Sequence, residues 1–182
     1  MKTNDIPARA LSGEAFGKGE REAQRRWARR RPRDPVRLAR LLLDHIPAEY
    51  RTRIEAVPFF FLATSNSRGQ CDCSFKGGGP GLVRVLDART LAFPDFSGND
   101  LFMSLGNVLE NPQVGLLFID FADGARLRVN GRASIYDAGP PLELFPGAPR
   151  AIVVEIDEVT PNCAARVPRL RPVPETNQDD QL

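Results

Sequence analysis

Residues 71–81 read Cys71-Asp-Cys-Ser-Phe-Lys-Gly-Gly-Gly-Pro-Gly81, and residues 90–104 read Thr90-Leu-Ala-Phe-Pro-Asp-Phe-Ser-Gly-Asn-Asp-Leu-Phe-Met-Ser104. Each segment leads from an apolar, strand-like run into a bend of small residues that form hydrogen bonds readily. Both lie within the stretch from Phe59 to Ile135, around which the rest of the chain is organised. We expect the two segments to form the two sides of one binding site for an anionic ligand.

Strand-like runs surround these two segments. The unbroken apolar run Pro58–Thr64 is followed by the turn-forming residues Ser65-Asn-Ser-Arg-Gly69, which predicts a buried strand and a hairpin. Further strands are predicted at 70–76, 82–86, 91–93, 114–121, 126–136 and 151–157, with Gly131 marking a bulge or bend. A helix is predicted at Asp100–Glu110, with Asn99 or Asp100 as its N-cap. Short strands joined by hairpins, with one helix between them, predict an antiparallel barrel rather than a βαβ sheet.

Helical patterns precede the first strand. They predict a charged helix from Lys18 that stops at Pro32, a second helix at Val36–His45 and a third at Ala48–Ala56. The expected fold class is therefore mainly β with flanking helices (α+β). We divide the chain into an N-terminal arm with helices that pack on the barrel (1–57), the barrel itself (58–170) and a flexible C-terminal tail (171–182).

The composition fits one globular domain. A chain of 182 residues with 42% hydrophobic residues can bury a core of useful size. The net charge of +2 is close to neutral, so the overall charge gives no indication of a polyanionic partner. One basic cluster stands out, and we interpret it as the solvated face of a helix; the alternative is a nucleic-acid contact. The cluster comprises Arg25, Arg26, Arg29, Arg30, Arg31 and Arg33.

The cysteines and the single histidine do not suggest a metal site. Cys71, Cys73 and Cys163 match neither a zinc-ribbon spacing nor a redox pair, and His45 is far from them in sequence. We expect reduced, mostly structural thiols in a soluble, cytoplasmic protein. No apolar run is long enough to span a bilayer, and the N-terminus lacks a signal-peptide pattern.

Strand alternation divides residues 71–76 into two faces. Cys71, Cys73 and Phe75 are expected on a core face, and Asp72, Ser74 and Lys76 on a polar face that lines the site. The glycines that follow allow main-chain N–H groups to approach an anion closely, and Lys76 adds a positive charge.

The second segment adds the start of a helix. The unpaired N–H groups and partial positive charge of a helix N-terminus near Asn99 would favour a phosphate, and Ser104 and Asn107 can donate hydrogen bonds. Ordinary turn and capping chemistry would account for each of these residues as well.

The ordered series of motifs resembles the pyridoxamine 5′-phosphate oxidase-like family, and within it a branch of proteins expected to depend on FMN. The resemblance covers about residues 18–170 and rests on the series rather than on any single motif. The motifs are Gly19–Gln24, Phe61–Ser65, Cys73–Gly78, Pro80–Asp87, Thr90–Asp95, Ser104–Asn107, Glu110–Phe118 and Arg128–Ala133.

This resemblance implies a split β-barrel, a homodimer and one FMN held in the groove between the two subunits. It places Ser74, Phe75, Lys76 and Gly77 along the flavin ring and phosphate. The phosphate side would be closed by Phe93, Pro94, Asp95, Asn99, Ser104 and Asn107, with Arg126 and Arg128 as further candidates. The closing segment Pro161–Leu170 would reach the flavin site of the partner subunit.

The resemblance implies an FMN-dependent oxidoreductase acting on a small molecule. No residue is predicted as a catalytic acid, base or nucleophile, and flavin chemistry does not require one. The alternative is a split-barrel binding protein, with or without flavin, that performs no turnover.

Overall fold

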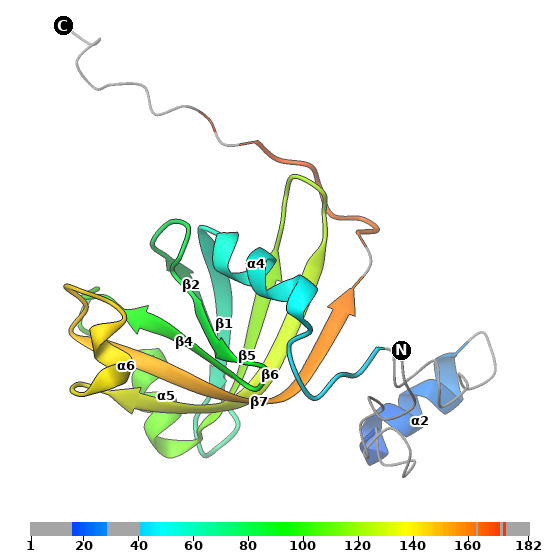
Figure 1. The fold of residues 1–182 in the computed structure, drawn as a ribbon. Helices are drawn as coiled ribbons and strands as arrows, with labels where there is room; N and C mark the ends of the chain where they lie inside the picture. The colour runs from blue at the N-terminus through cyan, green and yellow to red at the C-terminus, as the bar shows by residue number, and fades with distance from the viewer. Residues whose placement is uncertain (1–15, 29–40, 163, 172, 174–182) are drawn as a thin grey trace, which may run out of the picture.

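The computed structural model describes residues 16–28, 41–162, 164–171 and 173. Seven antiparallel strands form one sheet that curls into an open barrel (Figure 1). The strands are β1 (Phe59–Ser65), β2 (Cys71–Gly77), β3 (Arg84–Asp87), β4 (Thr90–Asp95), β5 (Gln113–Ile119), β6 (Arg126–Tyr136) and β7 (Arg150–Asn162). The predicted fold, a split barrel with flanking helices, is confirmed.

The spatial order of the strands is β2-β1-β5-β6-β7-β4-β3. Hairpins join β1 to β2, β3 to β4 and β5 to β6, and residues 137–149 connect β6 to its antiparallel neighbour β7. The pairs β1 with β5 and β4 with β7 are long-range. Strands β2 and β3 are the two edges of the sheet. The barrel therefore has an open side between β2 and the β4–β3 pair, which we call the seam.

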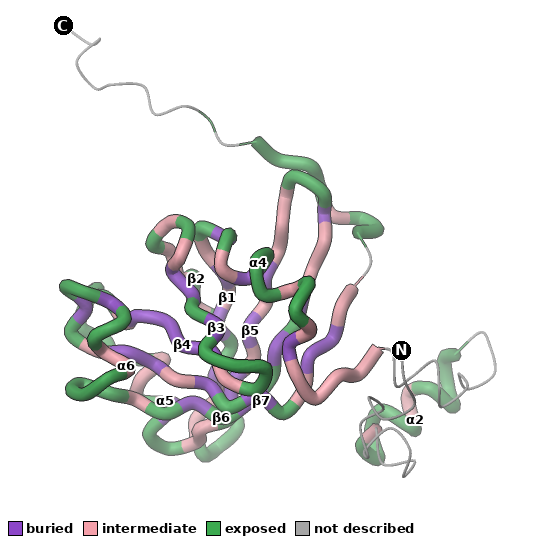
Figure 2. The backbone as a smooth tube through the Cα atoms, viewed as in Figure 1, coloured by how far each residue is buried: buried purple, intermediate pink, exposed green. Residues whose placement is uncertain are grey.

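The barrel interior is filled by alternate residues of each strand. On β1, Phe60, Leu62 and Thr64 are buried, as the period of a strand requires. The Phe60 ring packs against Phe93 and Phe118, with ring centroids 5.0 and 5.4 Å apart. Figure 2 shows this buried interior running along all the central strands.

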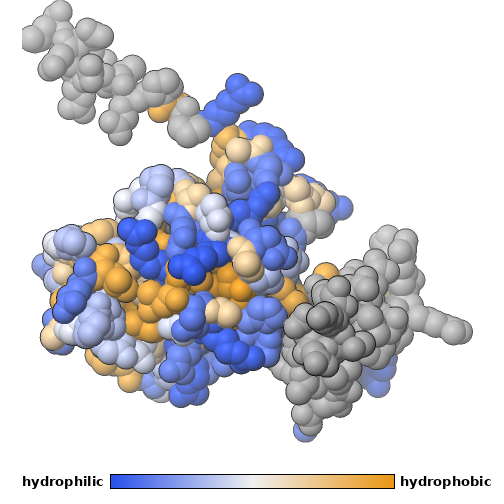
Figure 3. Space-filling model, in the orientation of Figure 1, coloured by the Kyte–Doolittle hydropathy of each residue, from blue (hydrophilic) through white to orange (hydrophobic). Residues whose placement is uncertain are grey.

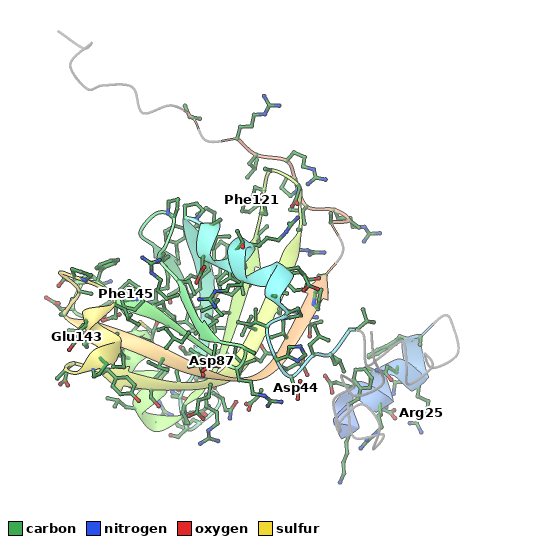
Figure 4. All side chains as sticks on the ribbon, in the orientation of Figure 1. Arg25, Asp44, Asp87, Phe121, Glu143 and Phe145 are labelled. Atoms are coloured by element: carbon green, nitrogen blue, oxygen red, sulfur yellow. The ribbon has the colours of Figure 1, made fainter. Side chains whose placement is uncertain are left out.

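Helices cover the two ends of the barrel. The predicted helix Ala48–Ala56 is confirmed as α4, which inserts Ile54, 1% exposed, into the core. At the opposite end lies α5 (Met103–Glu110), with Val108 buried (Figure 1). A four-residue helix, α6 (Pro140–Glu143), leads to Phe145, which packs on a smaller cluster of Ala92, Ala148 and Ala151 (Figure 4).

The charged N-terminal helix begins at Lys18 as predicted but ends at Trp27, before the predicted stop at Pro32, because Ala28 is already extended; none of the residues of this helix (α2, Lys18–Trp27) is buried. Arg25 and Arg26 both pair with Glu22, one turn earlier, as expected for a solvated face. The other four arginines of the basic cluster lie outside the described residues. No helix among the described residues is long and apolar enough to cross a membrane.

The predicted helix at Val36–His45 is wrong where it can be examined. Residues 36–40 lie outside the described part of the chain, and residues 41–45 form a bend and a single bridge instead of a helix. Leu43 exchanges main-chain hydrogen bonds of 2.9 and 2.7 Å with Val159 of β7. This pairing satisfies backbone groups that a helix would have satisfied locally, so a tertiary contact overrides the local pattern.

The predicted N-cap of α5 is also wrong. The helix begins at Met103, and the N-cap residue is Phe102, which has a left-handed backbone (φ 49°) and no side-chain cap. The Asn99 side chain accepts a hydrogen bond from the Leu101 N–H at 3.2 Å, which makes a turn before the helix. Asp100 is left-handed as well (φ 60°), so the loop before α5 has two unfavourable backbone conformations.

Candidate functional site

Charged side chains from three strands meet at the seam. Lys76 on β2 places its Nζ 3.9 Å from Oδ1 of Asp95 on β4, so this ion pair spans the open side of the barrel. Arg150 on β7 donates from Nε to Oδ2 of the same carboxylate at 2.9 Å. Two cations therefore share one carboxylate, and this group carries one unit of net positive charge.

Hydroxyl groups lie beside this cluster. The Oγ atoms of Ser74 on β2 and Ser104 on α5 are 3.0 Å apart, and Ser104 also donates to Asp72 at 3.3 Å. Ser104, Lys76 and Asp95 form the polar rim of a small hollow at the seam. The rest of its lining is apolar and comprises Leu62, Phe93, Leu105, Val108, Val114 and Ile152.

Helix α5 is held on the β1–β2 hairpin by polar side chains. Asn107 donates to the hydroxyl of buried Thr64 at 2.9 Å, and Asn111 donates to Ser65 at 2.9 Å. These bonds fix the position of Ser104, one turn before Asn107. Asn107 was predicted to contact a ligand; in the structure it anchors the helix that carries a site residue.

The glycine-rich turn is not an anion cradle, contrary to expectation. The N–H groups of Gly78 and Gly79 donate to the Pro58 carbonyl at 3.2 and 3.0 Å, and that of Gly81 donates to the Glu55 carbonyl at 2.7 Å. These groups are therefore occupied within the protein. The turn ties β2 and β3 to α4, and the positive φ angles of Gly79 and Gly81 explain why it needs glycine.

The expected core face of β2 is wrong as well. Cys71, Cys73 and Phe75 are exposed, with Phe75 at 60%, whereas the Ser74 and Lys76 side chains point inward. Because β2 is an edge strand at the seam, its inner face is the site wall and its outer face meets solvent. Phe75 lies over Gly77, where an added Cβ would be 2.7 Å from the ring.

Phe75 belongs to an aromatic cluster on the outer face of the sheet. Its ring centroid is 5.1 Å from that of Phe59 and 6.1 Å from that of Phe61. Phe121, just after β5, stacks on Phe59 at 6.1 Å and is labelled near the β5–β6 connection in Figure 4. In the view of Figure 3, apolar surface forms a band across the barrel with hydrophilic surface on either side.

Within the single chain, Arg126 and Arg128 lie away from the charged group that contains Lys76 and Asp95. Phe75 pairs with Phe61, Phe61 with Leu117, and Leu117 with Arg128, so this row places Arg128 on the outer face. Arg128 donates to the Asn162 side chain at 3.1 Å. Arg126 lines a separate hollow between α4 and the β5–β6 strands. Within the single chain these two arginines are not brought to the predicted phosphate site.

The remaining predicted site residues do not all lie at the hollow. Phe93 is buried and lines the hollow, while Pro94 is buried opposite Ala151 in the β4–β7 ladder. Asn99 is exposed in the turn before α5. The structure thus brings Ser74, Lys76, Phe93, Asp95 and Ser104 together and leaves the others at its margin or elsewhere.

Sequence reasoning missed Arg150, Asp72 as a partner of Ser104, and Phe102. Arg150 lies directly opposite Asp95 in the β4–β7 ladder. Its guanidinium also lies over the Phe102 ring, 5.2 Å from the centroid. The Arg150–Asp95 contact follows from the register of two strands far apart in sequence, and the Phe102 contact from the placement of the α5 N-cap beside them. Among the described residues, no group of three or more His, Cys, Asp or Glu side chains is placed to hold a metal ion.

Comparison with known proteins adds the family. A sequence model described as pyridoxamine 5′-phosphate oxidase matches residues 46–163, which include the whole barrel up to the end of β7. Comparison with curated proteins gives no match.

Solved structures share the fold. A variant of HupZ from Group A Streptococcus aligns with a TM-score of 0.53 and 16% identity, covering 64% of this chain and 99% of that protein. A candidate pyridoxamine 5′-phosphate oxidase from Lactobacillus delbrueckii aligns with a TM-score of 0.51 and 19% identity, covering 64% and 93%. At these identities the likeness establishes the barrel alone. Together with the sequence match over most of the chain, it shows that the protein belongs to the pyridoxamine 5′-phosphate oxidase family.

Proposed function

We propose that the protein binds FMN at the seam and acts as an FMN-dependent oxidoreductase on a small molecule. The observation that carries this proposal is that Lys76 and Ser104 lie at the polar rim of the hollow, with the Ser74 hydroxyl next to that of Ser104, in a chain of this family. The expectation that Ser74, Lys76 and Ser104 act together comes from the sequence, and their proximity supports it.

The donors at the rim suit a phosphate monoester. A phosphate accepts hydrogen bonds from hydroxyl and ammonium groups, which Ser74, Ser104 and Lys76 supply. Asp95 does not exclude an anion, because Lys76 and Arg150 together outweigh its charge. Asp72 accepts a hydrogen bond from Ser104 and weakens the positive field there, so hydrogen bonds would add to the charge of Lys76 and Arg150 in holding the phosphate.

A bound flavin would supply hydride or electron transfer. The chain would contribute binding and orientation, with Lys76 and the two serines holding the phosphate end. Asn107 and Thr64 would keep Ser104 in place through α5.

We further propose a homodimer with the site at the subunit interface. The outer face of β2, β1 and β5 carries the aromatic cluster described above, which comprises Phe59, Phe61, Phe75 and Phe121. The exposed ring of Phe75 would be costly to leave in water. A partner subunit covering this face would bury the cluster. It would also bring Arg128, which lies on the same face, to the border between the two subunits.

The second candidate function is a split-barrel binding protein that performs no turnover. The observation that favours it is that the charged groups described at the rim, Lys76 and Asp95, are already engaged in ion pairs with each other and with Arg150. Bound FMN without NAD(P)H consumption, tested with a panel of acceptors, would support this candidate against the oxidoreductase.

The binding proposal is tested by measuring the dissociation constant for FMN. The wild-type protein is expected to purify with flavin absorption or to take up FMN with a thermal shift. Lys76→Ala is expected to weaken binding by about 1–3 kcal/mol, the range for a charged hydrogen bond.

Lys18→Ala is the matched control, because Lys18 is an exposed lysine on α2, where no residue is buried. It should leave the FMN dissociation constant unchanged. An equal effect of both substitutions, or none from Lys76→Ala, would remove Lys76 from the site.

A further inference from the structure

The Arg150 side chain is mostly buried at the seam and is held there by contacts with neighbouring side chains. Its side chain is 25% exposed, and those of Asp95 and Lys76 are 12% and 22% exposed. The three groups are thus largely withdrawn from water, where charge–charge interactions are stronger than at the surface. Nε of Arg150 is fixed by Asp95 at 2.9 Å, which sets the plane of the guanidinium.

The second contact of Arg150 is the Phe102 ring. The guanidinium carbon lies 5.2 Å from the ring centroid, within range of a cation–π interaction. Among the described residues, Asp95 and Phe102 are the groups that hold the guanidinium. Neither uses the two terminal nitrogens, so a planar pair of donors is left for a ligand, and this geometry matches two oxygens of a phosphate.

The same residues connect Arg150 to the rim of the hollow. Ile152, two residues further along β7, lines the hollow, and side chains two apart on a strand share a face. Phe102 is the N-cap of α5, and Ser104 of that helix belongs to the rim. Arg150 therefore lies on the rim side of β7, across Asp95 from Lys76.

We propose that Arg150 is the residue that recognises the phosphate monoester of the ligand and so selects FMN over riboflavin. This inference rests on the proposed function. Asp95 acts as a positioning residue that orients the guanidinium between its two neighbours, and Lys76 adds the second charge. Lys76 provides a compact positive charge, whereas Arg150 on β7 provides the planar pair of N–H donors that can bind two phosphate oxygens.

The test compares FMN and riboflavin, which differ by the phosphate alone, as ligands of the full chain. Dissociation constants are measured by quenching of flavin fluorescence for wild type, Arg150→Ala and Arg150→Lys. The wild type is expected to prefer FMN at least tenfold. Arg150→Ala should weaken FMN binding about 10- to 100-fold and change riboflavin binding less than about twofold. Arg150→Lys should fall between the two for FMN.

Arg68→Ala, in the exposed β1–β2 turn, is the matched arginine control and should change neither constant. Thermal melting reports whether each variant is folded; if Arg150→Ala is not, Arg150→Lys decides, and an unchanged FMN constant in that variant overturns the inference.

The results that would overturn the role of Arg150 differ from those that would overturn the proposed function. Equal wild-type affinity for FMN and riboflavin, or an Arg150→Ala variant that weakens both ligands alike or neither, overturns the role of Arg150 and leaves flavin binding intact. A wild-type protein that binds neither flavin overturns both this inference and the proposed function.

Discussion

At the scale of single residues, Gly131 is the described glycine at which an added Cβ would meet the shortest contact. It lies at the bulge where the register between β6 and β7 shifts, as the sequence predicted. A Cβ added there would be 2.1 Å from the Glu155 carbonyl oxygen. The neighbouring atom belongs to the backbone of a central strand, so it cannot rotate away as a side chain would.

Gly131→Ala is therefore expected to destabilise the fold by about 3 kcal/mol or more, measured by chemical denaturation. Gly106→Ala is the control, because nothing lies within 4 Å of a Cβ at Gly106 in the middle of α5. That substitution should stabilise the protein by about 0.5–1 kcal/mol. A small loss for Gly131→Ala would show that the two strands are not as close as described.

The site residues illustrate what one sequence can and cannot predict. Lys76 and Ser104 were identified because a charged residue before a bend and a serine in the next helix are local features. Arg150 was missed because its role depends on lying opposite Asp95, a pairing across 55 residues of chain. The glycine turn was misread because the same composition serves an anion or a carbonyl oxygen equally well, and Pro58 and Glu55 supply the carbonyls.

At the scale of elements, α5 depends on hydrogen bonds to the β1–β2 hairpin. Beyond Asn107 and Asn111, Glu110 accepts from the Ser67 hydroxyl at 2.7 Å and from the Ser67 N–H at 3.1 Å. The hydroxyl and then the N–H of Ser67 hold the pKa of Glu110 below its ordinary value near 4.5. Because the folded-state pKa is the lower one, the stabilisation is present above about pH 4.5 and is lost as the pH falls through the folded-state pKa.

Titration of the Glu110 carboxyl by NMR should therefore show a pKa below the ordinary value. Ser67→Ala should raise that pKa only part of the way back, because the main-chain N–H remains. Ser134→Ala, an exposed serine on β6, should leave it unchanged. An ordinary pKa for Glu110 in the wild type would mean that α5 is not held at its C-terminal end by this contact.

The predictability of an element depended on whether its partners were local. Strand β6 was predicted with both of its ends, Arg126 and Tyr136, because alternation is regular along it. Helix α4 was equally clear, since Pro47 and Pro58 bound it. The helix prediction failed at residues 41–45 because Val159, more than one hundred residues later, provides hydrogen bonds to this segment.

At the scale of the whole molecule, the aromatic face of the sheet predicts self-association. Phe75 is 60% exposed in the single chain, so Phe75→Asp should leave folding of the subunit largely intact. We expect this variant to be monomeric under conditions where the wild type is a dimer, as judged by analytical ultracentrifugation, because a buried carboxylate would oppose the interface.

Leu144→Asp changes a side chain of similar character, 40% exposed, near α6 on another part of the surface. It should not alter the association state. A monomeric wild type, or a Phe75→Asp variant that still dimerises, would contradict the proposed interface.

The seam also affects where the barrel unfolds locally. Elsewhere in the barrel neighbouring strands are joined by ladders of main-chain hydrogen bonds, but between β2 and β4 the described connection is the Lys76–Asp95 ion pair. Because no main-chain ladder is described at this point, we expect separating these strands to cost less free energy than separating paired strands, so local opening should be concentrated there. An anion bound between β2, β4 and β7 would lower the population of this opened state in proportion to its affinity. Ligand occupancy and the resistance of the β2 edge to local unfolding are then two measures of one equilibrium.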